Sequence, residues 1–162
     1  MPIKNYTTMV AEDRTVGEIM GLLSTKGARS ISINYDEGGG PDGISFVIAV
    51  ENTPIPFRLP CNFEGVRRAM YEEFKDRSAR ARWERDGEKQ AQVRRIAWRI
   101  VKDWVAAQMA LIEAHQASLA QVFFPYATDN RGMTAFDKFM VTMTNPDRQL
   151  EADNAAPGSE ER

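Results

Sequence analysis

The sequence has very few of the residues that build metal and hydrolytic sites. Its 162 residues include a single cysteine, Cys61, and a single histidine, His115. One cysteine cannot form an internal disulfide or a zinc site of several thiolates, and one histidine removes most Ser-His and Cys-His catalytic arrangements. The carboxylates show no spacing that by itself makes a general-acid pair. We therefore expect no metal, no cofactor and no catalytic residues, and we expect that the protein is not an enzyme.

Long apolar runs are also missing. The longest, Ile44 to Val50, has the length of a strand, whereas a membrane-spanning helix needs about 20 apolar residues. The first residues do not follow the charged and then apolar pattern of a secretory signal. The sequence predicts no membrane association, a cytoplasmic location and, from its length, one globular domain.

The patterning of the first half predicts a helix followed by a small sheet, within an α+β fold. Thr15 and Glu18 have the spacing of a capping box, so a short helix is expected from Thr15 to about Lys26. Three stretches of alternating apolar residues then predict a three-stranded antiparallel meander: 30–35, 44–50 and 55–59. The expected buried face of the first strand is Ile31, Ile33 and Tyr35.

The second half is predicted to be mostly helical, with one long central helix over 92–115. Its expected apolar stripe is Val93, Ala97, Ile100, Trp104, Gln108, Leu111 and His115. Asn62 is the expected cap of an earlier helix, and residues 75–90 fit either a charged helix or a loop. Short helices are expected after Ser118 and near the end. We predict one domain over 1–145 and a disordered acidic tail over 146–162.

The small net charge of −2 hides a strong asymmetry along the chain. Residues 1–66 carry 5 basic and 8 acidic side chains, residues 67–102 carry 12 and 6, and residues 103–162 carry 4 and 9. A basic middle segment of this kind can bind a polyanion, or it can pair with the acidic segments on either side. The six acidic residues inside the basic segment favour internal pairing.

Four cations of the central helix lie off its expected apolar stripe and form the candidate anion site: Arg94, Arg95, Arg99 and Lys102. Guanidinium groups bind phosphate bidentately, so this face could receive a nucleotide or a nucleic acid. An exposed, salt-bridged helix face is the alternative. Trp98 and Trp83 are the candidate interface residues, because an exposed tryptophan suits a dimer contact or a stacked base. A homo-oligomer is expected on that basis.

Several stretches of the sequence resemble a group of small proteins encoded by bacteriophages and prophages. The resemblance covers about residues 1–140 and is carried by these segments: 2–8, 34–36, 95–104 and 122–126. It implies a role in a bacterial host cell, commonly in viral DNA metabolism or evasion of host defence, and usually through binding. It implies no catalytic residues.

These expectations lead to two hypotheses about function. The first is an anti-defence binding protein that sequesters a nucleotide signal or blocks a host defence protein. The alternative is a nucleic-acid-binding accessory protein in phage replication or recombination. Salt separates them, because binding to a nucleic acid weakens steeply as ionic strength rises.

Overall fold

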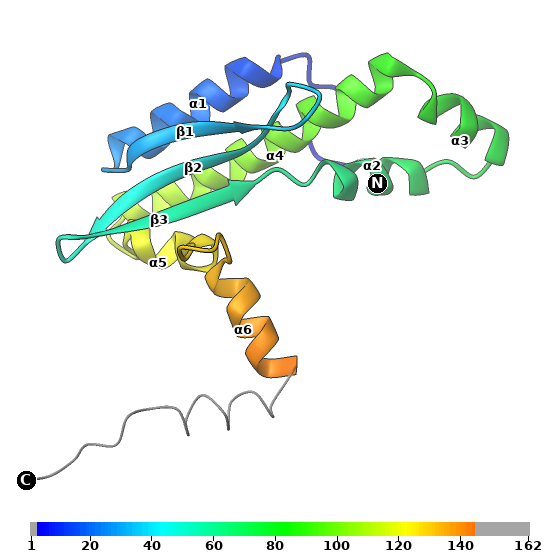
Figure 1. Ribbon diagram of the computed structural model, residues 1–162. Coiled ribbons are helices and arrows are strands. Elements are labelled where there is room, and N and C mark those ends of the chain that lie inside the picture. The colour runs from blue at the N-terminus through cyan, green and yellow to red at the C-terminus, as the bar shows by residue number, and fades with distance from the viewer. Residues whose placement is uncertain (1–2, 145–162) are drawn as a thin grey trace, which may run out of the picture.

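The computed structural model describes residues 3–144 and has the expected α+β fold. An N-terminal helix precedes a three-stranded sheet, and the rest of the chain is helical (Figure 1). The elements are α1 (Glu12–Thr25), β1 (Arg29–Tyr35), β2 (Pro41–Val50), β3 (Thr53–Pro60), α2 (Phe63–Glu72), α3 (Arg77–Glu84), α4 (Gly87–Glu113), α5 (Leu119–Phe123), the 3₁₀ turn η1 (Phe124–Tyr126) and α6 (Ala135–Thr144).

The sheet is the predicted antiparallel meander in the order β1-β2-β3. Alternation places every second residue of β2 on one face, where Phe46 lies opposite Phe57 of β3 and the two rings stack at 5.5 Å. The β2–β3 turn has positive φ at Glu51 and Asn52, which is the conformation that suits a two-residue hairpin with the right-handed twist of its strands.

Tyr35 does not lie on the buried face, so that part of the prediction is wrong. The register of β1 against β2 shifts between Asn34 and Tyr35, and Tyr35 pairs with Pro41. An irregularity of one residue moves the following side chain to the other face of the sheet. The Tyr35 side chain is accordingly 58% exposed.

Helices α1 and α4 lie along one face of the sheet and form the second layer of the fold (Figure 1). Trp98 of α4 is completely buried and donates its indole N–H to the carbonyl oxygen of Pro41 at 3.2 Å. This bond satisfies the polar atom of a large core side chain and fixes α4 against the start of β2. The described core also contains Ile19, Ile44 and Phe123.

The buried face of α4 differs from the predicted stripe in the last half of the helix. The buried residues of α4 are Val93, Ile96, Ala97, Trp98, Val105 and Met109. Leu111 and His115, two members of the predicted stripe, are exposed. Helix α4 contacts four other helices, α1, α2, α3 and α5, so more than one side of it is covered and no single stripe describes its buried surface.

Residues 75–90, for which the sequence left helix and loop open, form α3 and the start of α4. Asp76 caps α3 by accepting from the backbone N–H groups of Ser78 and Ala79, and Asp86 caps α4 by accepting from Glu88 and Lys89. Trp83 holds α3 against the rest of the fold, with its ring 5.9 Å from Phe74. This buried tryptophan explains why so charged a segment folds onto the body of the chain.

The other helix boundaries test the remaining predictions. The Asn62 cap and the Ser118 capping box are confirmed, since both side chains accept the expected backbone hydrogen bonds. The predicted capping box at Thr15 is wrong: α1 begins at Glu12, and the Thr15 hydroxyl donates to the Ala11 carbonyl inside the first turn. The predicted tail over 146–162 lies outside the described residues. No helix within residues 3–144 is long and apolar enough to cross a membrane.

Candidate anion-binding surface

Arg94, the first of the predicted anion-site residues, is fully engaged within the fold. Its guanidinium donates to Glu12 of α1 at 2.9 Å, to Asp36 at 2.8 Å and to the Pro41 carbonyl at 2.9 Å. It also lies over the ring of Phe63, 4.1 Å from the ring centroid. The backbone N–H of Gly40, followed by the Arg94 guanidinium, lowers the pKa of Asp36. Arg94 is therefore a structural residue that joins α1, the β1–β2 turn and α2 to α4.

Two other members of the predicted site are also paired. Arg99 donates to Glu18 of α1 at 2.7 Å, and Lys102 lies 3.9 Å from Asp103. Asn5 and Lys4 of the N-terminal arm contact the same Asp103 carboxylate at 3.0 Å. Hydrogen bonds from these two side chains, Asn5 first, lower the pKa of Asp103. The predicted alternative, a salt-bridged helix face, therefore describes the middle of α4.

The two tryptophans proposed as interface residues are in the core. Trp98 is 0% exposed and Trp83 is 5% exposed, so neither can stack on a base or contact a second copy from the surface. Trp104, the other tryptophan of α4, is partly buried and packs edge-on against Phe123 and Tyr126. The expected homo-oligomer loses this basis.

The single cysteine is a core residue too. Cys61 is buried directly after β3, as is common for a free cysteine. Burial raises the pKa of its thiol to about 12, although the nearby Arg94 charge acts in the opposite direction. The thiol is therefore protonated at neutral pH and a poor nucleophile.

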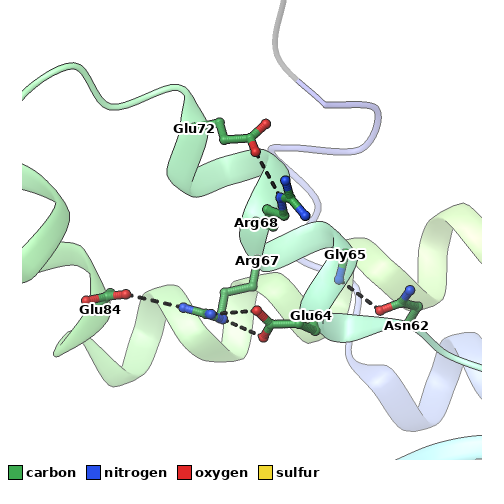
Figure 2. A network of polar contacts seen from close by, with 7 residues as sticks. All are labelled: Asn62, Glu64, Gly65, Arg67, Arg68, Glu72 and Glu84. Carbon is green, nitrogen blue, oxygen red and sulfur yellow. Dashed lines mark hydrogen bonds and ion pairs between the residues drawn. The ribbon is translucent and has the colours of Figure 1, made fainter.

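The arginines of α2 are neutralised by carboxylates of α2 and α3. Figure 2 shows Arg67 between Glu64 and Glu84, with contacts of 2.6 Å and 3.3 Å, and Arg68 paired with Glu72 at 3.0 Å. The Arg67 hydrogen bonds lower the pKa of Glu64. These residues line a hollow of about 450 Å³ together with Arg80 and Tyr71. Its three arginines face three glutamates, so the hollow has no excess of positive charge for an anion.

The acidic residues of the basic segment have specific partners in the structure. Asp76 and Asp86 are helix caps, Glu84 is held by Arg67, and Glu72 is held by Arg68. Glu72 and Glu84 are thus ion-paired within α2 and α3, whereas Asp76 and Asp86 accept backbone hydrogen bonds at helix N-termini. Several neighbouring cations have no carboxylate oxygen within 4.0 Å among the described residues.

Three such cations lie along one surface of α3 and α4, and we call them the cation track: Arg82, Lys89 and Arg95. Among the described residues, none of the three has a carboxylate oxygen within 4.0 Å. Arg82 and Lys89 line one hollow of about 200 Å³ with Phe74, Ala79, Trp83 and the Asp86 that caps α4. Lys89 and Arg95 line a second hollow of about 390 Å³. Lys89 lines both hollows, so the two hollows meet at this residue.

The second hollow is built by the N-terminal arm as well as by the helices. Its lining includes Tyr6, Thr7 and Met9 of the arm, Met70 of α2, and Glu88, Lys89, Gln92 and Arg95 of α4. The Gln92 amide donates to the carbonyl oxygens of Tyr6 and Thr8 at 2.9 Å each, while its own oxygen accepts from Arg95 at 2.7 Å. One glutamine thus holds both the arm and the Arg95 guanidinium, and Tyr6 remains 42% exposed beside them.

The sequence identified only one member of this surface. Arg95 was predicted, whereas Arg82, Lys89 and Tyr6 were missed. The available signal was the spacing of the acidic residues, because an aspartate directly before each helix indicates a cap rather than a surface charge. The contribution of the arm could not be read from spacing, since Tyr6 and Gln92 are far apart in the chain.

Comparisons with protein-family models, curated proteins and solved structures gave no match. The resemblance to phage proteins stays a prediction. The function must therefore be argued from the surface itself.

Proposed function

We propose that this protein binds nucleic acid without catalysis, through the cation track of Arg82, Lys89 and Arg95. The observation that carries the proposal is the separation of charges along the basic segment. Arg67, Arg68, Arg94 and Arg99 each have a carboxylate partner within the fold. Arg82, Lys89 and Arg95 instead line two hollows that share Lys89, and among the described residues they have no carboxylate oxygen within 4.0 Å. A row of free cations along a groove suits a chain of phosphates spaced along a backbone.

A single strand fits this surface better than a duplex. Tyr6 is exposed at the edge of the hollow that holds Lys89 and Arg95. An exposed aromatic ring next to free cations can stack on an unpaired base while the cations contact its phosphates. In a duplex the bases are stacked on one another, and Tyr6 would have no face to contact. This preference supports the predicted role as a nucleic-acid-binding accessory protein.

Binding of a nucleotide signal is the second candidate, and one observation favours it. The hollow beside Tyr6 has a volume of about 390 Å³, in the range of small-molecule sites, and contains both Lys89 and Arg95. Glu88 in the same lining opposes a compact, highly charged phosphate group. We rank this candidate below the nucleic acid, since a nucleotide would use one hollow and leave Arg82 without a role. An anti-defence role for either ligand stays a prediction.

The test is a titration of a fluorescently labelled single strand of about 20 nucleotides with the full chain, measured by polarisation at several salt concentrations. Binding to a single strand should weaken with salt by a slope of about 0.7 for each phosphate contacted. The triple variant Arg82→Ala, Lys89→Ala, Arg95→Ala should lose most of that slope. Tyr6→Ala should weaken binding with the slope unchanged, whereas Tyr6→Phe should bind normally.

The control is the pair Arg29→Ala and Arg58→Ala, two cations of the sheet with no ion pair among the described residues. It removes two positive charges, and the triple variant removes three, so losses are compared per charge removed. This variant changes the net charge in the same direction but leaves the cation track intact. Equal losses in the control and in the triple variant would reject a localised site. Saturable binding of a mononucleotide with little dependence on salt, and none of the single strand, would favour the second candidate.

A further inference from the structure

Helix α6 carries an apolar stripe that is not covered by any described part of the chain. Its large apolar side chains, Phe136, Phe139, Met140 and Met143, are between 41% and 63% exposed, and no residue of α6 is buried. Their spacing of three, four and seven positions places them on one side of the helix. An amphipathic stripe of this kind normally faces another apolar surface.

The base of α6 is held firmly, so the stripe has a defined position. Ala135 donates to the Ala127 carbonyl at 2.8 Å, and the Lys138 ammonium lies 2.9 Å from the Asp129 carboxylate. The Lys138 contact is the main cause that lowers the pKa of Asp129 to about 2. From this base the helix extends away from the sheet and from α4 (Figure 1).

The same chain has an apolar hollow that matches the stripe in character. It has a volume of about 240 Å³ between β3, α4 and η1, and it is lined by Leu59, Pro60, Ile100, Val101, Trp104 and Tyr126. No residue of α6 is in this lining. One chain thus presents an uncovered apolar helix and, separately, an uncovered apolar hollow.

We propose that two copies of this chain form a symmetric dimer in which the α6 stripe of each copy docks into the hollow of the other. A two-fold axis makes such an exchange reciprocal, so both apolar surfaces of both copies are covered at once. The occupant is a second copy rather than an anionic membrane, because α6 carries one cation and one anion, Lys138 and Asp137, and Lys138 is already paired.

The area to be buried distinguishes this arrangement from a simple pairing of two α6 helices. Four half-exposed apolar side chains offer on the order of 400 Å² per stripe. Two stripes packed on each other would bury roughly 800 Å², the size of a crystal contact. In reciprocal docking each stripe covers a hollow and the surface around it, and the two sides of a contact bury similar areas, so two such contacts bury on the order of 1,600 Å², the size of a standard stable interface.

Light scattering coupled to gel filtration on the full chain, over a range of concentrations, tests the dimer. The wild-type protein should have the mass of two chains, and the double variant Phe139→Asp, Met143→Asp should have the mass of one, with an unchanged circular dichroism spectrum. Tyr35→Asp is the control, because it removes an exposed apolar side chain from the sheet instead. A monomeric wild type, with or without binding to lipid vesicles, would overturn the proposal, as would a dimer that survives the double variant.

A crosslink identifies the surface that α6 contacts. A photoreactive phenylalanine at position 139 should join two chains, and mass spectrometry should place the attachment in the hollow, near Ile100, Val101 or Trp104. Attachment to α6 of the second chain, or only within one chain, would overturn the docking arrangement.

Discussion

Arg94 and Arg95 are neighbours in α4, but Arg94 is bonded within the fold and Arg95 faces an open hollow. The Arg94 guanidinium is held by Glu12, Asp36, the Pro41 carbonyl and the Phe63 ring. Among the described residues, the Arg95 guanidinium donates hydrogen bonds to Gln92 alone. Successive residues of a helix point about 100° apart. That rotation directs one arginine toward the sheet and α1 and the other toward the open hollow beside the arm. Whether a basic residue of α4 stabilises the fold or can contact a ligand thus depends on the direction of its side chain. The charge of the neighbouring sequence does not decide it.

The largest expected effect tests whether the region around Arg94 is closed to solvent. With its pKa raised from 9.0 to about 12, the Cys61 thiol should have roughly a thousandfold less thiolate at pH 8 and react correspondingly slowly with a thiol reagent. Ser24→Cys, an exposed position on α1, is the control and should react at an ordinary rate. Equal rates for the two cysteines would show that the Arg94 region opens readily.

Removal of Arg94 should cost stability, while removal of Arg95 should cost binding. Arg94→Ala leaves the Glu12 and Asp36 carboxylates facing each other without a cation, and we expect it to lower the free energy of unfolding by about 2–3 kcal/mol. Arg95→Ala should change it by less than about 0.5 kcal/mol, as for an ordinary surface substitution. Urea unfolding of both variants measures this difference, and similar losses would mean that the two arginines are equivalent.

A glycine beside Arg94 provides a steric test of the same contact. A methyl group at Gly40 would lie 2.9 Å from the Arg94 Cζ atom, so Gly40→Ala must displace the guanidinium and should destabilise the protein by about 1–3 kcal/mol. Gly21 of α1 has open space around it, and Gly21→Ala should stabilise by about 0.5–1 kcal/mol. Thermal unfolding that moves in the same direction for both variants would place Arg94 elsewhere.

The smallest effect comes from converting a paired arginine into a free one. Glu64→Gln together with Glu84→Gln removes both carboxylate partners of Arg67, which should add about one phosphate contact and steepen the salt dependence of single-strand binding by about 0.7. Glu37→Gln with Glu51→Gln makes the same change in net charge without freeing an arginine. If the two double variants bind equally, net charge alone controls binding and the pairing of Arg67 has no effect.

Local signals in the sequence were sufficient for most of the elements. The alternation in β2 and β3, the cap at Asn62 and the capping box at Ser118 depend on neighbouring residues and were confirmed. The prediction that Tyr35 is buried was wrong because an irregular pairing with β2 turns its side chain to the other face of the sheet. No local pattern in the sequence encodes that register shift. The predicted burial of the last residues of the α4 stripe was wrong because several elements contact the helix from different sides.

The candidate surface was much less predictable than the fold. Charge counting identified the basic segment over 67–102 but assigned its last part, with Arg94 and Arg99, to the anion site. The carboxylates that neutralise them, Glu12 and Glu18, lie about 80 positions earlier on α1. Which cations remain free depends on which carboxylates the fold brings near them, and pairing across such separations has no periodicity in the sequence.

By itself, the sequence determined the fold class, the long central helix and the concentration of positive charge between residues 67 and 102, since propensity, patterning and composition are local properties. Only the tertiary structure decided that Trp98 and Trp83 are core residues, that Arg94 and Arg99 are paired, and that Arg82, Lys89 and Arg95 have no carboxylate partner within residues 3–144. The reason is physical: burial and ion pairing depend on distances between segments, and folding sets those distances through the packing of the whole core.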